Sequence, residues 1–234
     1  MKIPLWLKRE FYIFSSMWLE SLKFIVAVLL SFLIVWGAIN FPAVYKNIKF
    51  WFFINYKGQD AASYWKLPDI SKEQAAIPNN YLFIPKIGVQ APIIFLDTTD
   101  EKVILEKLKE GVVHYKGTAL PGEIGNVFIT GHSSYYWWAK GKYNHVFSLL
   151  DKLVIGDEIY INYNHIRYTY KVFEVKITHP KDLSIMEPTS EPILTLMTCT
   201  PLGTSFKRLV VRAKQIDPPP SLNVAPLKKT LPVQ

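Results

Sequence analysis

A long apolar stretch near the N-terminus constrains this chain more than any other feature. No charged residue occurs between Lys23 and Lys46, and residues 24–39 are almost entirely apolar. A helix of this length can cross a hydrocarbon core about 30 Å thick. A cleaved signal peptide is the alternative, but its apolar part is only about 7 to 15 residues long, and no clean Ala-x-Ala site follows here. The pattern therefore predicts an uncleaved transmembrane helix over residues 24–45, after an N-terminal segment of residues 1–23.

The remainder of the chain divides into a linker, one domain and a tail. Residues 46–79 read as a stalk, because an aromatic run at residues 50–53 is suited to a membrane interface and prolines follow it. Residues 80–217 are enough for a single domain with a real core. Residues 218–234 are polar and rich in proline, so we expect a disordered tail.

Charge and cysteine content exclude several functions. The net charge is +8, but the lysines are scattered and form no basic block, so we expect no nucleic acid partner and attribute the charge to attraction toward an anionic membrane or envelope. The single cysteine excludes a disulfide within the chain and any multi-cysteine metal site. We expect no metal site and no cofactor.

The domain is predicted to be mainly β. Short β-prone segments, several with alternating apolar residues, are separated by Pro, Gly and Asn turns, which favours a closed barrel. The expected strands are residues 81–84, 89–95, 127–130, 158–162, 166–177, 193–199 and 208–216. Short helices are expected at residues 103–109 and 147–152. Alternating βαβ units are missing from the pattern, so a doubly wound parallel sheet is not expected.

Cys199 ends one of these strands. A lone thiol in that position is either a small buried hydrophobe or a nucleophile, and residue type alone favours the first. A nucleophilic thiol reacts as the thiolate and therefore needs a basic or cationic neighbour.

Among five histidines, His132 is the best candidate for that neighbour. It follows the strand at residues 127–130 directly after Gly131, so both His132 and Cys199 are presented at strand ends. A loop histidine bonded to the backbone is the equally weighted alternative. His165 lies in an expected hairpin turn and His179 in a loop before a proline, and neither position favours catalysis. His114 and His145 rank only slightly higher.

Arg208 is the third candidate. A loop containing Pro and Gly separates Cys199 from the next strand, which favours antiparallel pairing of the two strands. Symmetric pairing sets Cys199 opposite Arg208, and Arg212 opposite Thr195, roughly 13 Å further along. A slip of one residue in this register would place every side chain of the strand on the opposite face of the sheet. A guanidinium can hold a substrate carbonyl or a developing oxyanion.

At these residues the chain resembles the sortases, membrane-anchored cysteine transpeptidases of the bacterial cell envelope. Three segments carry the resemblance, in order and at matching spacing: residues 84–93, residues 117–126 leading into Thr130-Gly131-His132, and residues 195–199 followed by 208–211. The resemblance implies a closed eight-stranded β-barrel, with His132, Cys199 and Arg208 as the catalytic residues. It also implies a single-pass protein of the cell membrane, with residues 1–23 in the cytoplasm and the catalytic domain outside the cell.

The implied reaction is acyl transfer. Cys199 would attack the carbonyl after the threonine of a C-terminal Leu-Pro-x-Thr-Gly type signal on a secreted protein, and His132, as imidazolium, would protonate the departing amine. Arg208 would stabilise the oxyanion, and an amine of peptidoglycan or of a pilin lysine would resolve the thioester. Thr198 would touch the substrate, although a threonine bonded to its own strand neighbours is an equal alternative.

The subclass rests on a departure from the family pattern. Sortases that polymerise pilins commonly carry an Asp-Pro-aromatic lid, whereas residues 65–69 read Trp-Lys-Leu-Pro-Asp. We therefore expect a protein similar to classes C, D or E that anchors single proteins, with pilin polymerisation as the alternative. A non-catalytic β-barrel binding module of the envelope is the alternative from another class.

Overall fold

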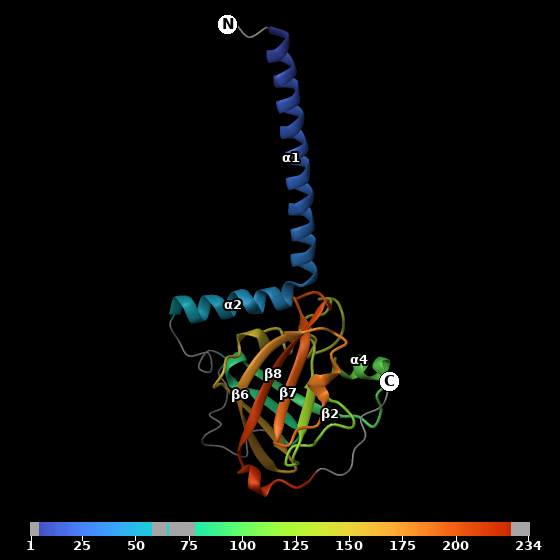
Figure 1. The fold of residues 1–234 in the computed structure, drawn as a ribbon, viewed down its shortest axis with the longest axis vertical. Helices are drawn as coiled ribbons and strands as arrows, with labels where there is room; N and C mark the ends of the chain where they lie inside the picture. The colour runs from blue at the N-terminus through green and yellow to red at the C-terminus, as the bar shows by residue number, and fades with distance from the viewer. Residues whose placement is uncertain (1–4, 58–64, 66–77, 226–234) are drawn as a thin grey trace. The chain divides into compact units, whose positions relative to one another are not determined.

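The computed structural model describes residues 5–57, 65 and 78–225, and side-chain burial from residue 18 onward. The chain forms two compact units, residues 1–41 and residues 42–234. The first unit consists of helix α1 (Leu5–Ile39), drawn in blue in Figure 1. Its segment Trp18–Ile39 has a mean hydropathy of 2.5 over its most apolar window, and none of that window is buried. This helix is long and apolar enough to cross a membrane.

Helix α2 (Phe41–Lys57) follows directly and, apart from its first residue, belongs to the second unit. One face of this helix is buried, with Ala43 fully covered and Phe50 packed into the hydrophobic core. Trp51 and Phe52 remain exposed. The first part of the predicted stalk is therefore a helix with one face on the barrel, whereas most of the remaining stalk lies outside the described residues.

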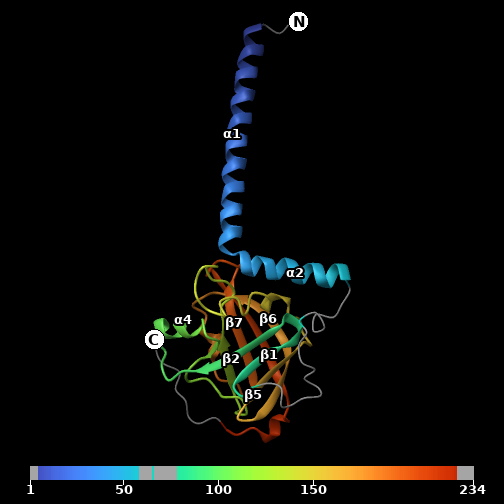
Figure 2. The same ribbon diagram turned by 180° about the vertical axis from the view of Figure 1, so that it is seen from behind.

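The second unit is a closed barrel of eight described strands in the order β1-β2-β3-β4-β7-β8-β6-β5. Figure 1 shows β6, β7 and β8 on one side, and Figure 2 shows β1, β2 and β5 on the other. The pairs β2/β3 and β4/β7 are parallel and the other pairs are antiparallel. The strands are β1 (Tyr81–Ile84), β2 (Val89–Phe95), β3 (Val112–His114), β4 (Asn126–Thr130), β5 (Glu158–Tyr163), β6 (Ile166–Thr178), β7 (Ile193–Thr200) and β8 (Lys207–Asp217). The predicted fold class is confirmed.

Local signals explain several elements. Asn164 and His165 both have positive φ, as a two-residue hairpin turn between β5 and β6 requires, which agrees with the hairpin expected there. Helix α4 (Glu101–Lys107) starts after Asp100, whose side chain accepts a hydrogen bond from the Lys102 amide at 2.8 Å. The second expected helix is a short 3-10 turn, Leu150–Lys152.

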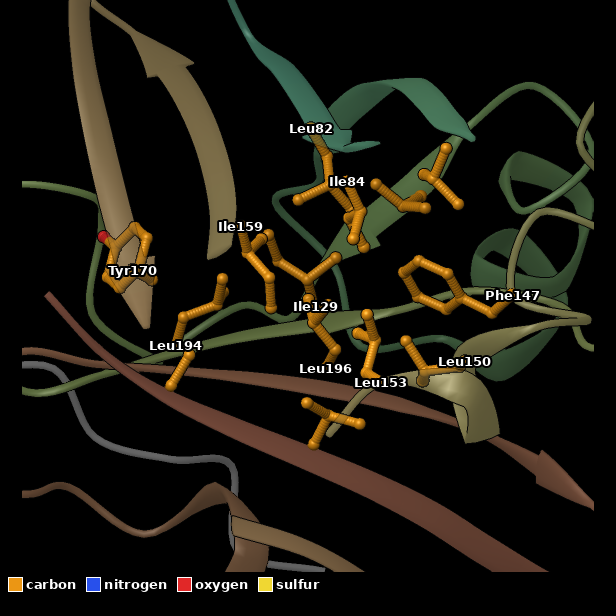
Figure 3. Close-up of a cluster of buried hydrophobic side chains, with 14 of the residues drawn as sticks. Leu82, Ile84, Ile129, Phe147, Leu150, Leu153, Ile159, Tyr170, Leu194 and Leu196 are labelled. Carbon is orange, nitrogen blue, oxygen red and sulfur yellow. The ribbon is translucent and has the colours of Figure 1, made fainter. Parts of the chain in front are cut away.

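The barrel interior is filled by large apolar side chains from both halves of the sheet (Figure 3). Burial of such residues is the main stabilising contribution in a closed sheet of this size. The fully buried members shown there are Leu82, Ile84, Ile129, Phe147, Leu150, Leu153, Ile159, Tyr170, Leu194 and Leu196.

The first part of the tail is ordered, which differs from the expected disorder. Asn223 and Gln215 exchange two side-chain hydrogen bonds, of 2.8 and 2.9 Å. Val224 then forms an isolated bridge with Glu123. These polar contacts hold residues 218–225 against the barrel. Because the segment has no apolar pattern, its hydropathy did not indicate that it would be ordered. Residues 226–234 lie outside the described part of the chain.

Candidate active site

Parallel pairing of β4 and β7 brings two strand ends to one edge of the barrel. Thr130 is the register partner of Met197, and the amide of Gly131 donates to the Met197 carbonyl at 3.2 Å. Since the carboxyl ends of parallel strands meet at the same edge, His132 and Cys199 emerge side by side. Sequence reasoning expected adjacent strand ends, and parallel pairing is the physical reason.

The antiparallel pair β7/β8 has the register expected from the loop between the strands. Cys199 is the direct partner of Arg208, and Thr195 is the partner of Arg212. Arg212 lies further along β8 and forms an ion pair with Glu174 at 3.1 Å. The register therefore sets Arg208 opposite Cys199, whereas Arg212 belongs to a structural ion pair.

All three candidate residues line one cleft of about 390 Å³. Most of the other lining side chains are apolar, and they come from helix α4, from β4 and β7, and from the 3-10 turn Leu183–Met186. The remaining lining residues are Thr99, Glu101, Ile104, Leu105, Leu108, Tyr115, Phe128, Thr130, Gly131, Pro180, Asp182, Leu183, Ile185, Met186, Met197 and Thr198. A cleft of this kind suits an extended peptide with apolar side chains.

His132 is largely buried beside the thiol strand. Burial, together with the smaller effects of the nearby charges of His145 and Lys109, lowers the pKa of its imidazole to about 4. Its Nε2 atom is buried and has no hydrogen-bond partner among the described residues. The ring lies 5.1 Å from the ring of Tyr135, measured between centroids. At neutral pH this histidine is therefore uncharged and able to accept a proton.

The other four histidines have local roles. His114 is buried in β3, with Nε2 2.8 Å from the Ala119 carbonyl oxygen. His145 accepts a hydrogen bond from the Tyr135 amide at 3.3 Å through Nδ1. His179 accepts one from the Lys181 amide at 3.2 Å. His165 occupies the β5/β6 turn. Over residues 5–57, 65 and 78–225, no three His, Cys, Asp or Glu side chains gather as a metal site requires.

The sequence left two alternatives for Thr198, contact with the substrate or a hydrogen bond to its strand neighbours. Its hydroxyl donates to the Gly131 carbonyl at 2.7 Å, and the side chain is buried. Gly131 itself lies so close to Phe147 that a Cβ there would come within 2.6 Å of the ring. The hydroxyl of Thr198 thus ties the end of β7 to the residue before His132, even though its side chain also lines the cleft.

Ser133 and Ser134 follow His132, and the sequence pattern assigned them no role. Ser134 accepts a hydrogen bond from the Gly203 amide at 2.9 Å, which joins the loop after β4 to the loop between β7 and β8. Ser133 is buried, and its hydroxyl has no partner among the described residues. A Gly-His-Ser-Ser sequence at a strand end is the only signal that pointed to them.

The comparisons of this chain with known proteins all match sortases. The Sortase domain family model matches residues 82–216. Sortase D of Bacillus subtilis (strain 168) is 28% identical over 170 residues, which cover 68% of this chain and 78% of that protein. Sortase C1 of GBS pilus island 1 has a TM-score of 0.50 and 33% identity, over 58% of this chain and 64% of that chain. A lid mutant of sortase A from Corynebacterium diphtheriae has a TM-score of 0.51 and 29% identity, over 67% and 80% of the two chains.

Proposed function

The chain belongs to the sortase family, and from that premise we propose that it is a membrane-anchored cysteine transpeptidase. Cys199 is the nucleophile, His132 transfers protons, and Arg208 stabilises the oxyanion. One observation carries the proposal: the only thiol of the chain shares a cleft with the largely buried imidazole of His132 and lies opposite an arginine. Those are the three groups that acyl transfer through a thioester requires.

The first half-reaction forms the thioester. His132 takes the thiol proton, the Cys199 sulfur bonds to the substrate carbonyl carbon, and negative charge develops on the carbonyl oxygen near Arg208. The carbon–nitrogen bond then breaks, and His132 returns its proton to the departing amine. The lowered pKa of His132 supports this order, because the imidazole is neutral at rest and becomes imidazolium only after taking the thiol proton.

The second half-reaction releases the acyl group. An incoming amine bonds to the thioester carbon, His132 takes a proton from the amine nitrogen, and the carbon–sulfur bond breaks. The proton returns to the Cys199 sulfur. The product is a new amide, and no cofactor enters either step.

For the substrate, we propose a secreted protein with a C-terminal signal of the Leu-Pro-x-Thr-Gly type. The cleft supports this class, since Leu105, Ile185 and Met197 offer an apolar surface beside the three reactive side chains. We propose that the enzyme anchors single proteins to an amine of peptidoglycan. Residues 66–69, on which the comparison with the pilin-polymerising lid depended, lie outside the described part of the chain.

We propose a single membrane pass with the catalytic domain outside the cell. Helix α1 supports the pass by length and composition. Helix α2 begins two residues after α1 ends and exposes Ile48, Trp51 and Phe52 together with lysines, a composition suited to the lipid headgroup region.

The test uses the full-length protein in detergent with a panel of fluorogenic sorting-signal peptides and an amine. We expect cleavage, an amide product, and a thioester on Cys199 visible by mass spectrometry. The Cys199→Ala variant should lose all three while keeping the thermal unfolding midpoint of the parent. Equal function of this variant, or absence of any thioester across the panel, would instead support a non-catalytic binding module.

A further inference from the structure

A second cavity also borders Cys199, and neither His132 nor Arg208 lines it. It has a volume of about 100 Å³ and shares only Thr198 and Cys199 with the cleft. The other lining residues come from helix α2, the loop after β4, the segment at residues 147–151, the end of β7 with the loop that follows it, and β8. They are Asn47, Ser133, Phe147, Ser148, Asp151, Thr200, Leu202 and Leu209. The thiol therefore stands between a large apolar cleft and a small polar chamber.

The chamber combines an unpartnered hydroxyl with a negative charge. Ser133 is 5% exposed, and its buried hydroxyl has no partner among the described residues. A buried hydroxyl without a partner costs free energy unless a ligand or water satisfies it. Among the described residues that line the chamber, Asp151 carries the only formal charge, and that charge is negative. The cleft, by contrast, contains the cation Arg208.

Helix α2 forms one wall of the chamber. Asn47 donates to the Ser148 carbonyl at 3.0 Å and to the Ala43 carbonyl at 3.1 Å, which fixes its amide at the cavity. One residue earlier, Lys46 donates to the His145 carbonyl at 3.3 Å. The chamber is thus bounded partly by the helix that joins the barrel to the membrane segment.

We propose that this chamber is the binding site for the acceptor, a primary amine that arrives as an ammonium ion. The proposal rests on the proposed function. Once the acyl chain fills the cleft, the chamber is the cavity through which a second substrate can approach the thioester on Cys199. There the amine loses a proton to solvent or to a neighbouring base, its lone pair bonds to the thioester carbon, and the carbon–sulfur bond breaks. A second proton from the nitrogen passes through His132 to the sulfur.

Size and charge decide what can enter. The chamber has about a quarter of the volume of the cleft, so it admits an aminoalkyl or glycyl group and excludes a second sorting signal. Asp151 also pairs with Lys152 at 2.7 Å. Both side chains of that pair are exposed, and such pairs contribute little stability, so an ammonium ion can replace Lys152 at the carboxylate.

The test separates the two half-reactions in the full-length protein. Asp151→Asn and Ser133→Ala are compared with the parent and with Asp217→Asn, a matched control at the far, exposed end of β8. Thioester formation is followed by rapid-quench mass spectrometry without amine. The ratio of amide to hydrolysed product is then measured against the concentration of n-propylamine, which represents a lysine, and of glycinamide, which represents a peptidoglycan glycine.

We expect both chamber variants to form the thioester at the parent rate, and Asp151→Asn to need at least about fivefold more amine for equal amide product. Asp217→Asn should match the parent. An amine dependence unchanged in both chamber variants overturns the proposal, as does a slowed first half-reaction. Failure of the parent to form any thioester overturns the proposed function instead. A stronger effect with one amine than with the other identifies the acceptor.

Discussion

Two arginines four positions apart on β8 offer a direct comparison at the scale of single residues. Arg208 lines the cleft opposite Cys199, and its Nη1 donates to the carbonyls of Ser205 and Lys207 at 3.0 and 3.3 Å. Arg212 is committed to Glu174. Side chains at alternate positions share a face of the strand, so only contacts distinguish the two.

We expect Arg208→Gln to lower kcat/KM by about 100-fold or more, because one donor to the developing oxyanion is lost. Arg212→Gln should keep the activity of the parent and lose about 1 kcal/mol of stability or less, as for other partly exposed ion pairs. Steady-state kinetics with a sorting-signal peptide and urea denaturation measure the two effects. Equal activity losses in both variants would contradict the assignment.

The buried imidazole of His132 predicts a pH dependence of stability. Its pKa is lowered from 6.5 to about 4 in the folded protein, so between these values the unfolded chain binds more protons than the folded one. The contribution of His132 to the free energy of unfolding is therefore fully present above pH 6.5 and is lost as the pH falls toward 4. The upper limit of this loss is about 3.5 kcal/mol, since one pKa unit corresponds to about 1.4 kcal/mol.

His132→Asn should flatten this dependence when the free energy of urea unfolding is measured between pH 7 and pH 4. Part of the slope should remain, because burial also lowers the pKa of His145. His165→Asn, in the β5/β6 turn, is the control and should keep the full slope. A parent protein with equal stability at pH 7 and pH 4 would show that His132 is not buried as a neutral group.

At the scale of elements, the link between β4 and β7 holds the reactive groups together. The bond from Thr198 to the Gly131 carbonyl has a counterpart lower on the same strands, where the Thr195 hydroxyl donates to the Asn126 side chain at 2.7 Å. Both bonds are buried and both join the same two strands. They differ in their distance from His132.

We expect Thr198→Val and Thr195→Val each to lose about 1 to 3 kcal/mol of unfolding free energy, because each leaves a buried acceptor without its donor. Only Thr198→Val should also lower kcat, since only its bond positions the residue before His132. Denaturation curves and single-turnover rates separate the effects. If Thr195→Val lowers kcat as much, general loosening of the sheet explains the result.

The elements that sequence patterns predicted well are those with a clear apolar period. Seven of the eight described strands were expected within a residue or two of their observed bounds, including the 13-residue β6. The missed strand, β3, has only three residues and directly follows Gly111. A segment that short has no detectable period, and it becomes a strand because β2 and β4 pair with it on both sides.

On the scale of the whole molecule, Cys199 can report which side of the membrane the barrel occupies. It is the only cysteine in the chain, and it is partly exposed at the cleft. We expect a membrane-impermeant maleimide to label this protein at Cys199 when it is added to intact cells that express it. The Cys199→Ser variant should not be labelled. Labelling that requires detergent would contradict an extracellular catalytic domain.

The sequence by itself determined the apolar helix, the barrel class and the candidates His132, Cys199 and Arg208, because period, length and loop symmetry are local properties of the chain. Only the tertiary structure decided the parallel pairing of β4 with β7, the neutral state of His132 and the bond of Thr198 to Gly131. It also decided the chamber between Asn47 and Asp151. Each of these depends on which segments distant in sequence pack together, and burial, unlike hydropathy, is a property of the packed molecule.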